Sequence, residues 1–181
     1  AAGLLTFVGA FVAGGVLGTG FAGAVDWAAA VGATVLAVGA GMAINDYFDR
    51  EIDRVNRPDR PIPRGAVSPR EALAFSLVLF GVAVVLAVTL PPLAVAIAVV
   101  NLLALVAYTE LFKGLPGLGN ALVGYLTGST FLFGGAAVGG RLESVLVLFA
   151  LASLATFARE VVKDVEDVAG DREEGLRTLP I

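Results

Sequence analysis

Long uncharged runs, separated by short charged segments, make up most of this 181-residue chain. Most of the runs reach the roughly 17–25 residues that an apolar helix needs to cross the core of a bilayer, and none carries a sustained polar face. We therefore predict an all-α bundle of six transmembrane helices rather than the buried helices of a soluble protein. The predicted spans cover residues 4–25, 27–44, 72–90, 91–108, 115–140 and 142–158.

The charged residues sort by side once the runs are counted as spans. The second and fourth loops and the tail after the sixth span share one side of the membrane. They hold every basic residue except Arg141 and every acidic residue except Asp26 and Glu143. Loops rich in Arg and Lys remain in the cytoplasm. We therefore expect an integral membrane protein whose polar loops, and any active site they form, face the cytoplasm.

Composition narrows the possible chemistry. Hydrophobic residues make up 57% of the chain and charged residues 15%, against about 25% charged residues in ordinary soluble domains. Cysteine and histidine are absent, which excludes thiol nucleophiles, disulfides, zinc held by histidine and histidine-based triads. The net charge of −4 offers no basic surface for nucleic acid, and no protein partner can be inferred.

The second predicted span runs directly into a cluster of acids in the sequence NDYFDREID. At about 100° per residue, Asn45, Asp46, Asp49 and Asp53 fall on one face of a helix that extends out of the membrane. A solvated helix end would explain such a cluster in a soluble protein. At a membrane boundary, mutually repulsive carboxylates are costly and usually functional.

A second acidic cluster follows the sixth span and repeats the spacing of the first. Asp164, Asp167 and Asp171 are separated as D-x-x-D-x-x-x-D, with Gly170 as a possible end of the helix before the last of them. Because both clusters are predicted on the cytoplasmic side, we expect them to face each other across an oxygen-rich pocket. Such pockets suit Mg²⁺, which proteins usually hold through one or two carboxylates together with substrate phosphates.

A proline-rich loop, NRPDRPIPRGAVSPRE, follows the first cluster and cannot form a regular helix. It places Arg57 and Arg60 beside the first acidic face. Arginine pairs with phosphate oxygens through two parallel hydrogen bonds, so both residues are candidates for diphosphate binding. Two other roles stay open for each: a topology signal, or a counter-ion to a neighbouring Asp.

Local signals predict details of the helices. The start of the third span is marked by Ser68 as N-cap, Pro69 in the first helical position and Glu71 in the third, a pattern that forms a capping box. Pairs of glycines four residues apart predict close helix packing. These pairs are Gly14 with Gly18 and Gly124 with Gly128.

The fourth loop and the end of the sixth span add polar residues on the same side. Tyr108 and Lys113 lie in the loop, Asn120 follows it, and Lys163 directly precedes the second acidic cluster. A single Lys at a helix end usually anchors the chain at the membrane interface. Here its ammonium group could also reach a diphosphate.

These motifs resemble the UbiA superfamily of intramembrane prenyltransferases. The first family motif, N-x-x-x-D-x-x-x-D, is matched by Asn45, Asp49 and Asp53, and the second, D-x-x-x-D, by Asp167 and Asp171. The loop RPDRPIPRG is similar to the family's loop after its first motif. The resemblance covers nearly the whole chain in order.

The fourth loop also resembles its family counterpart, although the spacing from Tyr108 to Lys113 is one residue longer than the Y-x-x-x-K of many members. Family members have nine transmembrane helices and an active site at the cytoplasmic face. The resemblance therefore implies that residues 1–181 form a single membrane-embedded prenyltransferase domain with six of the nine helices, lacking the C-terminal ones.

The resemblance implies a transferase that uses Mg²⁺ and releases diphosphate. The motifs look most like the branch that makes archaeal ether lipids, whose members transfer a geranylgeranyl group to geranylgeranylglyceryl phosphate. Two Mg²⁺ ions would bridge the diphosphate of the prenyl donor, one at each acidic motif, with Asp46 and Asp164 in support. The residues implied for catalysis are Asp49, Asp53, Asp167, Asp171 and Lys113. Those implied for substrate binding are Arg57, Arg60, Tyr108, Lys113, Asn120 and Lys163.

Other functions remain open at this point. Within the family, the acceptor could be an aromatic quinone precursor, a chlorophyllide or haem, because the donor site would hardly change. The CDP-alcohol phosphotransferases also pair Asp residues with Mg²⁺, but their D-G-x-x-A-R-type signature is absent from the sequence. A divalent-cation transporter is a non-enzymatic alternative, although transport acids are expected in the middle of a span rather than at one end.

Overall fold

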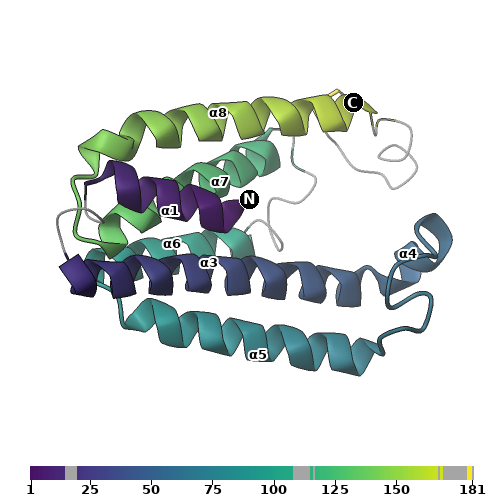
Figure 1. The fold of residues 1–181 in the computed structure, drawn as a ribbon. Coiled ribbons are helices and arrows are strands. Elements are labelled where there is room, and N and C mark those ends of the chain that lie inside the picture. Colours follow the sequence, from purple (N-terminus) through teal and green to yellow (C-terminus); the bar gives the residue numbers. More distant parts are fainter. Residues whose placement is uncertain (15–19, 108–114, 116, 167, 169–178, 181) are drawn as a thin grey trace.

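The computed structural model describes residues 1–14, 20–107, 115, 117–166, 168 and 179–180, and these form helices and turns without a strand. The all-α prediction is confirmed. Six helices correspond to the six apolar runs, and the short α4 continues α3 (Figure 1). The helices are α1 (Ala2–Val12), α3 (Gly20–Phe48), α4 (Arg50–Asn56), α5 (Pro69–Val88), α6 (Pro92–Ala107), α7 (Leu118–Ala137) and α8 (Glu143–Glu166).

Three of the described helices are long and apolar enough to cross a membrane, namely α3 from Gly23, α5 and α8. α1 and α6 are also apolar but are shorter within the described residues. α7 is as long as α5, at 20 residues, but contains more glycine and more hydroxyl side chains. Its composition suits a helix that is enclosed by other helices rather than by lipid.

The boundary predicted for the first span is wrong. A single helix was expected over residues 4–25, but α1 ends at Val12 and α3 already begins at Gly20, before Asp26. Gly14 has a φ of +80°, a conformation that glycine adopts without steric cost and that commonly ends helices. A Cβ at Gly14 would meet no described atom within 4 Å. Gly14 therefore turns the chain instead of packing against a helix, and Gly18 lies outside the described residues.

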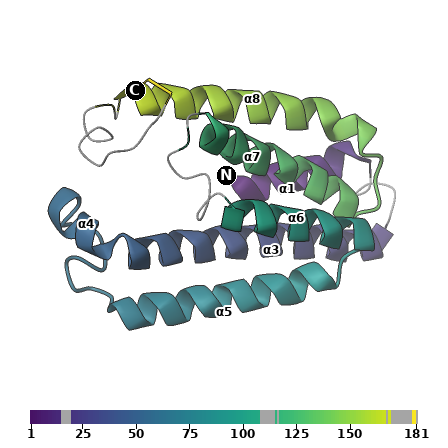
Figure 2. The same cartoon turned by 180° about the vertical axis from the view of Figure 1, so that it is seen from behind.

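The helices run up and down the bundle, so that alternate connections gather at the same end (Figures 1 and 2). One end carries α4, the loop over residues 57–68, the start of α7 and the end of α8; we call it the polar end. The opposite end carries the end of α1, the start of α3 and the connections α5–α6 and α7–α8. The second loop and the end of α8 thus share one end of the bundle, as the charge pattern predicted.

Close packing concentrates at the end opposite the polar end. One cluster of buried residues joins α3, α6 and α7 around Ala30, Ala94 and Phe133, and another joins α1, α7 and α8 around Phe131 and Val145. Most of these side chains are small, which lets helix backbones approach closely. This packed end holds the helices in the register that places the polar residues at the other end.

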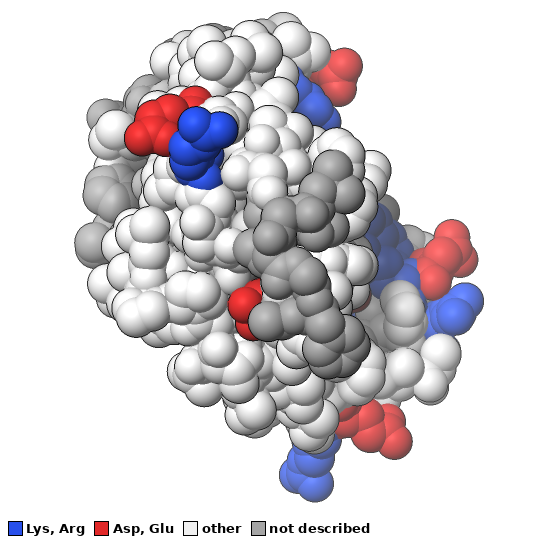
Figure 3. All heavy atoms as spheres, turned by 60° about the vertical axis from the view of Figure 1, so that its left-hand side comes forward, with Lys and Arg blue, Asp and Glu red and all other residues white. Residues whose placement is uncertain are grey.

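The outward-facing helix surfaces are apolar. Leu77 and Val85 of α5 and Leu151 and Leu154 of α8 are each about 60% exposed or more. On the face drawn in Figure 3, uncharged residues in white cover most of the described surface, and charged residues form a few separate spots. Apolar surface of this extent fits contact with lipid acyl chains.

Candidate active site

The first acidic motif lies where α3 passes into α4 at the polar end. Helical backbone bonds continue across the junction, because the Asp49 amide donates to the Asn45 carbonyl and the Asp53 amide to the Asp49 carbonyl, both at 2.8 Å. Asp49 itself sits between the two helices, with φ −83° and ψ 2°. The motif therefore keeps the near-helical spacing that the sequence predicts.

Arg60 joins two carboxylates of this motif. Its Nη1 donates to Oδ1 of Asp46 at 2.9 Å and to Oδ2 of Asp53 at 2.6 Å. Asp53 is only 5% exposed, whereas the side chains of Asp46 and Arg60 are about one-third exposed. The two acids therefore point their oxygens at the same place from one helical face. In the structure Arg60 is a counter-ion to Asp46 and Asp53, which is one of the roles that the sequence left open for it.

The other charges around α4 pair away from that place. Arg54 contacts Glu51 at 2.6 Å in an exposed ion pair. Arg50 donates to the Tyr47 carbonyl at 2.7 Å and stacks its guanidinium over the Tyr47 ring. Arg57 ends α4 with an exposed side chain. Of the arginines in this region, Arg60 is thus the one aimed at the acidic face.

The loop over residues 57–68 is held by its own turns, and it ends at the capping box predicted for α5. The Glu71 amide donates to the Ser68 hydroxyl at 3.2 Å, and the Ser68 amide donates to the Glu71 carboxylate at 2.8 Å. With Pro69 in the first turn, this confirms the predicted helix start. The cap fixes the point at which the loop ends and α5 begins.

A pocket of about 480 Å³ opens beside this loop, between α3 and α5. Asp46 contributes a carboxylate to its wall, while Ile62, Val67 and Phe75 contribute apolar surface. The sequence did not identify this pocket, because its wall combines residues from two helices and a loop. Asp46 of the acidic face thus borders a space whose lining also includes Glu71 and is otherwise apolar.

Of the three acids in the second acidic cluster, the structure describes only the first, Asp164. Asp164 of α8 accepts a hydrogen bond from the amide Nδ2 of Asn120 in the first turn of α7, at 2.8 Å. Asp167 and Asp171, together with Tyr108 and Lys113, lie outside the residues that the structure describes. The structure therefore joins Asn120 to Asp164, a pairing between residues far apart in sequence that was not predicted.

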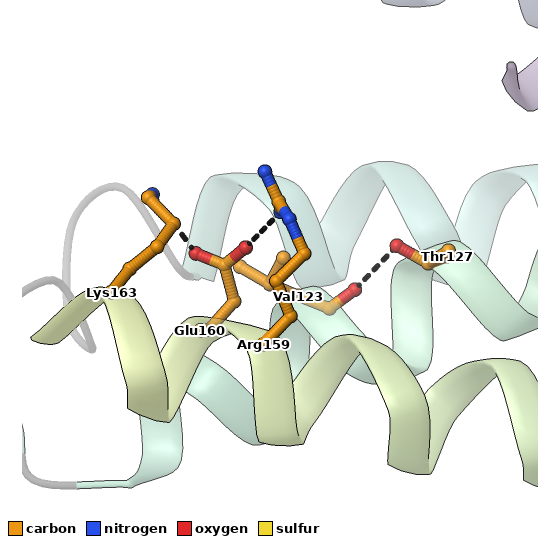
Figure 4. A network of polar contacts seen from close by, with 5 residues as sticks. All are labelled: Val123, Thr127, Arg159, Glu160 and Lys163. Atoms are coloured by element: carbon orange, nitrogen blue, oxygen red, sulfur yellow. Dashed lines mark hydrogen bonds and ion pairs between the residues drawn. The ribbon is translucent and has the colours of Figure 1, made fainter.

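Glu160, one turn before Asp164, is held differently. Its carboxylate contacts Nη1 of Arg159 at 2.6 Å and Nζ of Lys163 at 3.2 Å. Figure 4 shows both cationic groups next to this single carboxylate. Lys163 thus has Glu160 as its partner, and Glu160 is neutralised by two cations of its own helix.

The donors at the first motif fit a hard divalent cation. Asp46 and Asp53 direct oxygens at a point that a cationic group occupies in the structure. Within the described part of the chain, no three acidic side chains come close enough to form a complete metal site. A cation held here would therefore take some of its ligands from a phosphate group or from water. Mg²⁺ is commonly bound in this way.

Comparison with known proteins identifies close relatives. Residues 2–181 match the model of the UbiA prenyltransferase family. A digeranylgeranylglyceryl phosphate synthase of Natronomonas pharaonis is 72% identical over 181 residues, which cover 100% of this chain and 64% of the relative. One from Haloquadratum walsbyi is 63% identical and covers 100% of this chain and 62% of the relative.

A solved structure supports the same fold. It comes from a study of digeranylgeranylglyceryl phosphate synthase in membranes, and it superimposes with a TM-score of 0.81 at 36% sequence identity. The match covers 99% of this chain and 62% of that one. The chain thus spans less than two thirds of the length of the relatives it matches. Its family and its long apolar helices identify it as an integral membrane protein.

Proposed function

The chain belongs to the UbiA prenyltransferase family, and on that premise we propose that it transfers a geranylgeranyl group from its diphosphate to geranylgeranylglyceryl phosphate. Relatives that are 63–72% identical carry the name of the synthase that makes the corresponding product. The proposal includes the lipid acceptor, the prenyl donor and an active site that faces the cytoplasm.

The observation that carries the proposal is the convergence of Asp46 and Asp53 on one cationic group at the polar end. A site that binds a diphosphate through a cation needs carboxylates whose oxygens face one common point. It also needs an adjoining apolar space for the prenyl chain, and the pocket beside Asp46 has an apolar wall. A transporter would instead need its acids along a path through the bundle.

We assign roles to the residues by motif. Asn45, Asp49 and Asp53, supported by Asp46, would hold one Mg²⁺; Asp167 and Asp171, supported by Asp164, would hold a second. Bound there, Mg²⁺ supplies neutralisation of the negative charge that develops on the diphosphate. Lys113, Arg57, Arg60 and Lys163 add positive charge around the diphosphate, while Tyr108 orients it.

In the proposed reaction, the bond between C1 of the donor and the diphosphate oxygen breaks, and the diphosphate leaves with both electrons. The acceptor hydroxyl oxygen forms the new C–O bond to C1, and its proton passes to a site carboxylate or to water. Donors fixed in place before the reaction stabilise the leaving charge best. The apolar helices exclude water, which would otherwise capture the allylic carbon.

An acceptor panel tests this function. The full-length protein in lipid nanodiscs is incubated with geranylgeranyl diphosphate and Mg²⁺, and products are identified by mass spectrometry. We expect a product with geranylgeranylglyceryl phosphate and none with a 4-hydroxybenzoate-type acid, a chlorophyllide or haem. The reverse pattern would overturn the assigned acceptor, and no product with any acceptor would overturn the transferase.

Substitution tests the assigned carboxylates. Asp49→Ala and Asp167→Ala should each lower turnover by at least about 100-fold, because each removes a metal ligand. Asp49→Ala should keep the thermal stability of the wild type, since Asp49 is only partly buried; the melting temperature of Asp167→Ala is measured beside it. Activity close to wild type in both, with the usual Mg²⁺ dependence, would sink the assignment.

A further inference from the structure

The contact between α7 and α8 is set by glycines. Asn120, Gly124 and Gly128 follow one another at four-residue intervals and so lie on one face of α7. A Cβ at Gly124 would lie 2.6 Å from the Ser153 carbonyl oxygen of α8, and one at Gly128 would collide with Phe149 and Ser153. The two helices therefore meet backbone to backbone along this face.

The close approach of the helices brings Asn120 to Asp164. Asn120 lies in the first turn of α7, three residues after the N-cap Gly117, which has a φ of +71°. Its side chain extends the glycine face towards the polar end and donates from Nδ2 to Oδ2 of Asp164 at 2.8 Å. A larger residue at Gly124 or Gly128 would separate the helices and remove this contact.

The partner of Asp164 is chemically unlike that of its neighbour. Glu160 is paired with two cations, Arg159 and Lys163. Asp164 is held through one oxygen by a neutral amide, which orients a carboxylate without cancelling its charge. The second oxygen, Oδ1, has no hydrogen bond to any described residue. An acid held in this way suits a cation ligand, whereas Glu160 suits a structural ion pair.

We propose that Asn120 is a positioning residue, which holds the Asp164 carboxylate in place for a divalent cation while leaving it negatively charged. The inference rests on the proposed function and assigns a role to a residue that does not itself touch the diphosphate. It differs from the sequence-based expectation, which had Asn120 bind the substrate. Groups that orient metal ligands typically change metal affinity by about 10–100-fold when they are removed.

The competing explanation is that the hydrogen bond between Asn120 and Asp164 only holds α7 against α8. Exchanging the two residues distinguishes this structural role from positioning. Asn120→Asp combined with Asp164→Asn keeps an amide and a carboxylate in contact but moves the carboxylate from α8 to α7. If the hydrogen bond is only structural, this exchange should restore both the melting temperature and Mn²⁺ binding. If Asn120 is a positioning residue, the exchange should not restore Mn²⁺ binding, because the charged oxygen would come from the wrong helix.

The experiment measures Mn²⁺ binding by electron paramagnetic resonance, without turnover, and the melting temperature of the full-length protein in nanodiscs. We expect Asn120→Ala to weaken Mn²⁺ binding by about 10-fold or more. The exchanged pair should regain the melting temperature but not the Mn²⁺ affinity. Asn120→Gln, which keeps an amide on a longer side chain, replaces Asn120→Ala if that variant does not fold and should weaken binding as well.

Thr34→Val is the matched control, because it removes a side-chain hydrogen bond of 3.0 Å between Thr6 of α1 and Thr34 of α3. It should lower the melting temperature and leave Mn²⁺ binding within twofold of wild type. Unchanged Mn²⁺ affinity in Asn120→Ala, or full recovery of that affinity in the exchanged pair, would overturn the inference. Mn²⁺ binding that follows the expected pattern without prenyl transfer would overturn the proposed function alone.

Discussion

Among single residues, Arg60 stabilises a nearly buried carboxylate at the polar end by pairing with it. Asp53 is 5% exposed, and its Oδ2 lies 2.6 Å from Arg60 Nη1. Arg60→Ala should lower the free energy of unfolding by roughly 1–3 kcal/mol, because a nearly buried charged acceptor loses its donor. Reversible unfolding in detergent with added denaturant measures the difference.

Arg54 provides the control for that substitution. Its ion pair with Glu51 has the same 2.6 Å separation, but both side chains are about 60% exposed. Exposed pairs of this kind contribute little, so Arg54→Ala should stay within about 0.5 kcal/mol of wild type. An equal loss in the two variants would show that burial of Asp53 is not the reason for the effect.

At this scale the sequence correctly predicted that Asp46 and Asp53 share a helix face and that Arg60 lies beside it, but it missed the pairing of Asn120 with Asp164. Asp46 and Asp53 share a face because helical periodicity depends only on spacing. The contact between Asn120 and Asp164 depends on how α7 docks on α8, which no local pattern encodes. The role of Asp167 and Asp171 remains a proposal that their spacing suggests.

At the scale of helices, the start of α5 depends on one side chain. Ser68 accepts from the Glu71 amide at 3.2 Å and so satisfies a donor that the helix itself leaves free. Ser68→Ala should cost about 1 kcal/mol of unfolding free energy, and Ser68→Asp should recover most of it. Thermal unfolding of the three proteins checks the order. A Ser68→Asp variant no more stable than Ser68→Ala would contradict it.

The contact between α1 and α7 depends on glycine in the same way. A Cβ at Gly134 would collide with the Thr6 carbonyl, so Gly134→Ala must separate the helices and should cost about 1–3 kcal/mol. Gly81 of α5 is the control, since a Cβ there meets no described atom within 4 Å. Gly81→Ala should be neutral or stabilising by up to about 1 kcal/mol. Unfolding measurements that rank the variants in the opposite order would refute this account.

Helix boundaries were predictable only where polar residues mark them. Ser68, Pro69 and Glu71 form a local signal that needs no tertiary information, and it proved correct. The turn at Gly14 lies inside an apolar run, where hydropathy does not change at the end of the helix. A glycine there can pack or turn, and its φ of +80° is decided by the tertiary fold.

At the scale of the whole molecule, the predicted orientation can be tested directly because the chain contains no cysteine. Asp59 is exposed in the loop over residues 57–68, which precedes α5, and Thr89 is exposed directly after the other end of α5. In sealed vesicles, a membrane-impermeant thiol reagent applied from the cytoplasmic side should label Asp59→Cys and spare Thr89→Cys. The opposite labelling would place the proposed active site on the outer side of the membrane.

The pairing of Arg60 with the acidic face also bears on how the protein is made. Arg60 follows Asp53 by seven residues and Asp46 by 14. A growing chain therefore releases these acids and their cation almost together, long before the residues of α7 and α8 are translated. The first half of the site can reach the membrane surface with both of these acids already paired to one arginine. The ribosome thus delivers the costliest charges of the protein already accompanied by their counter-ion.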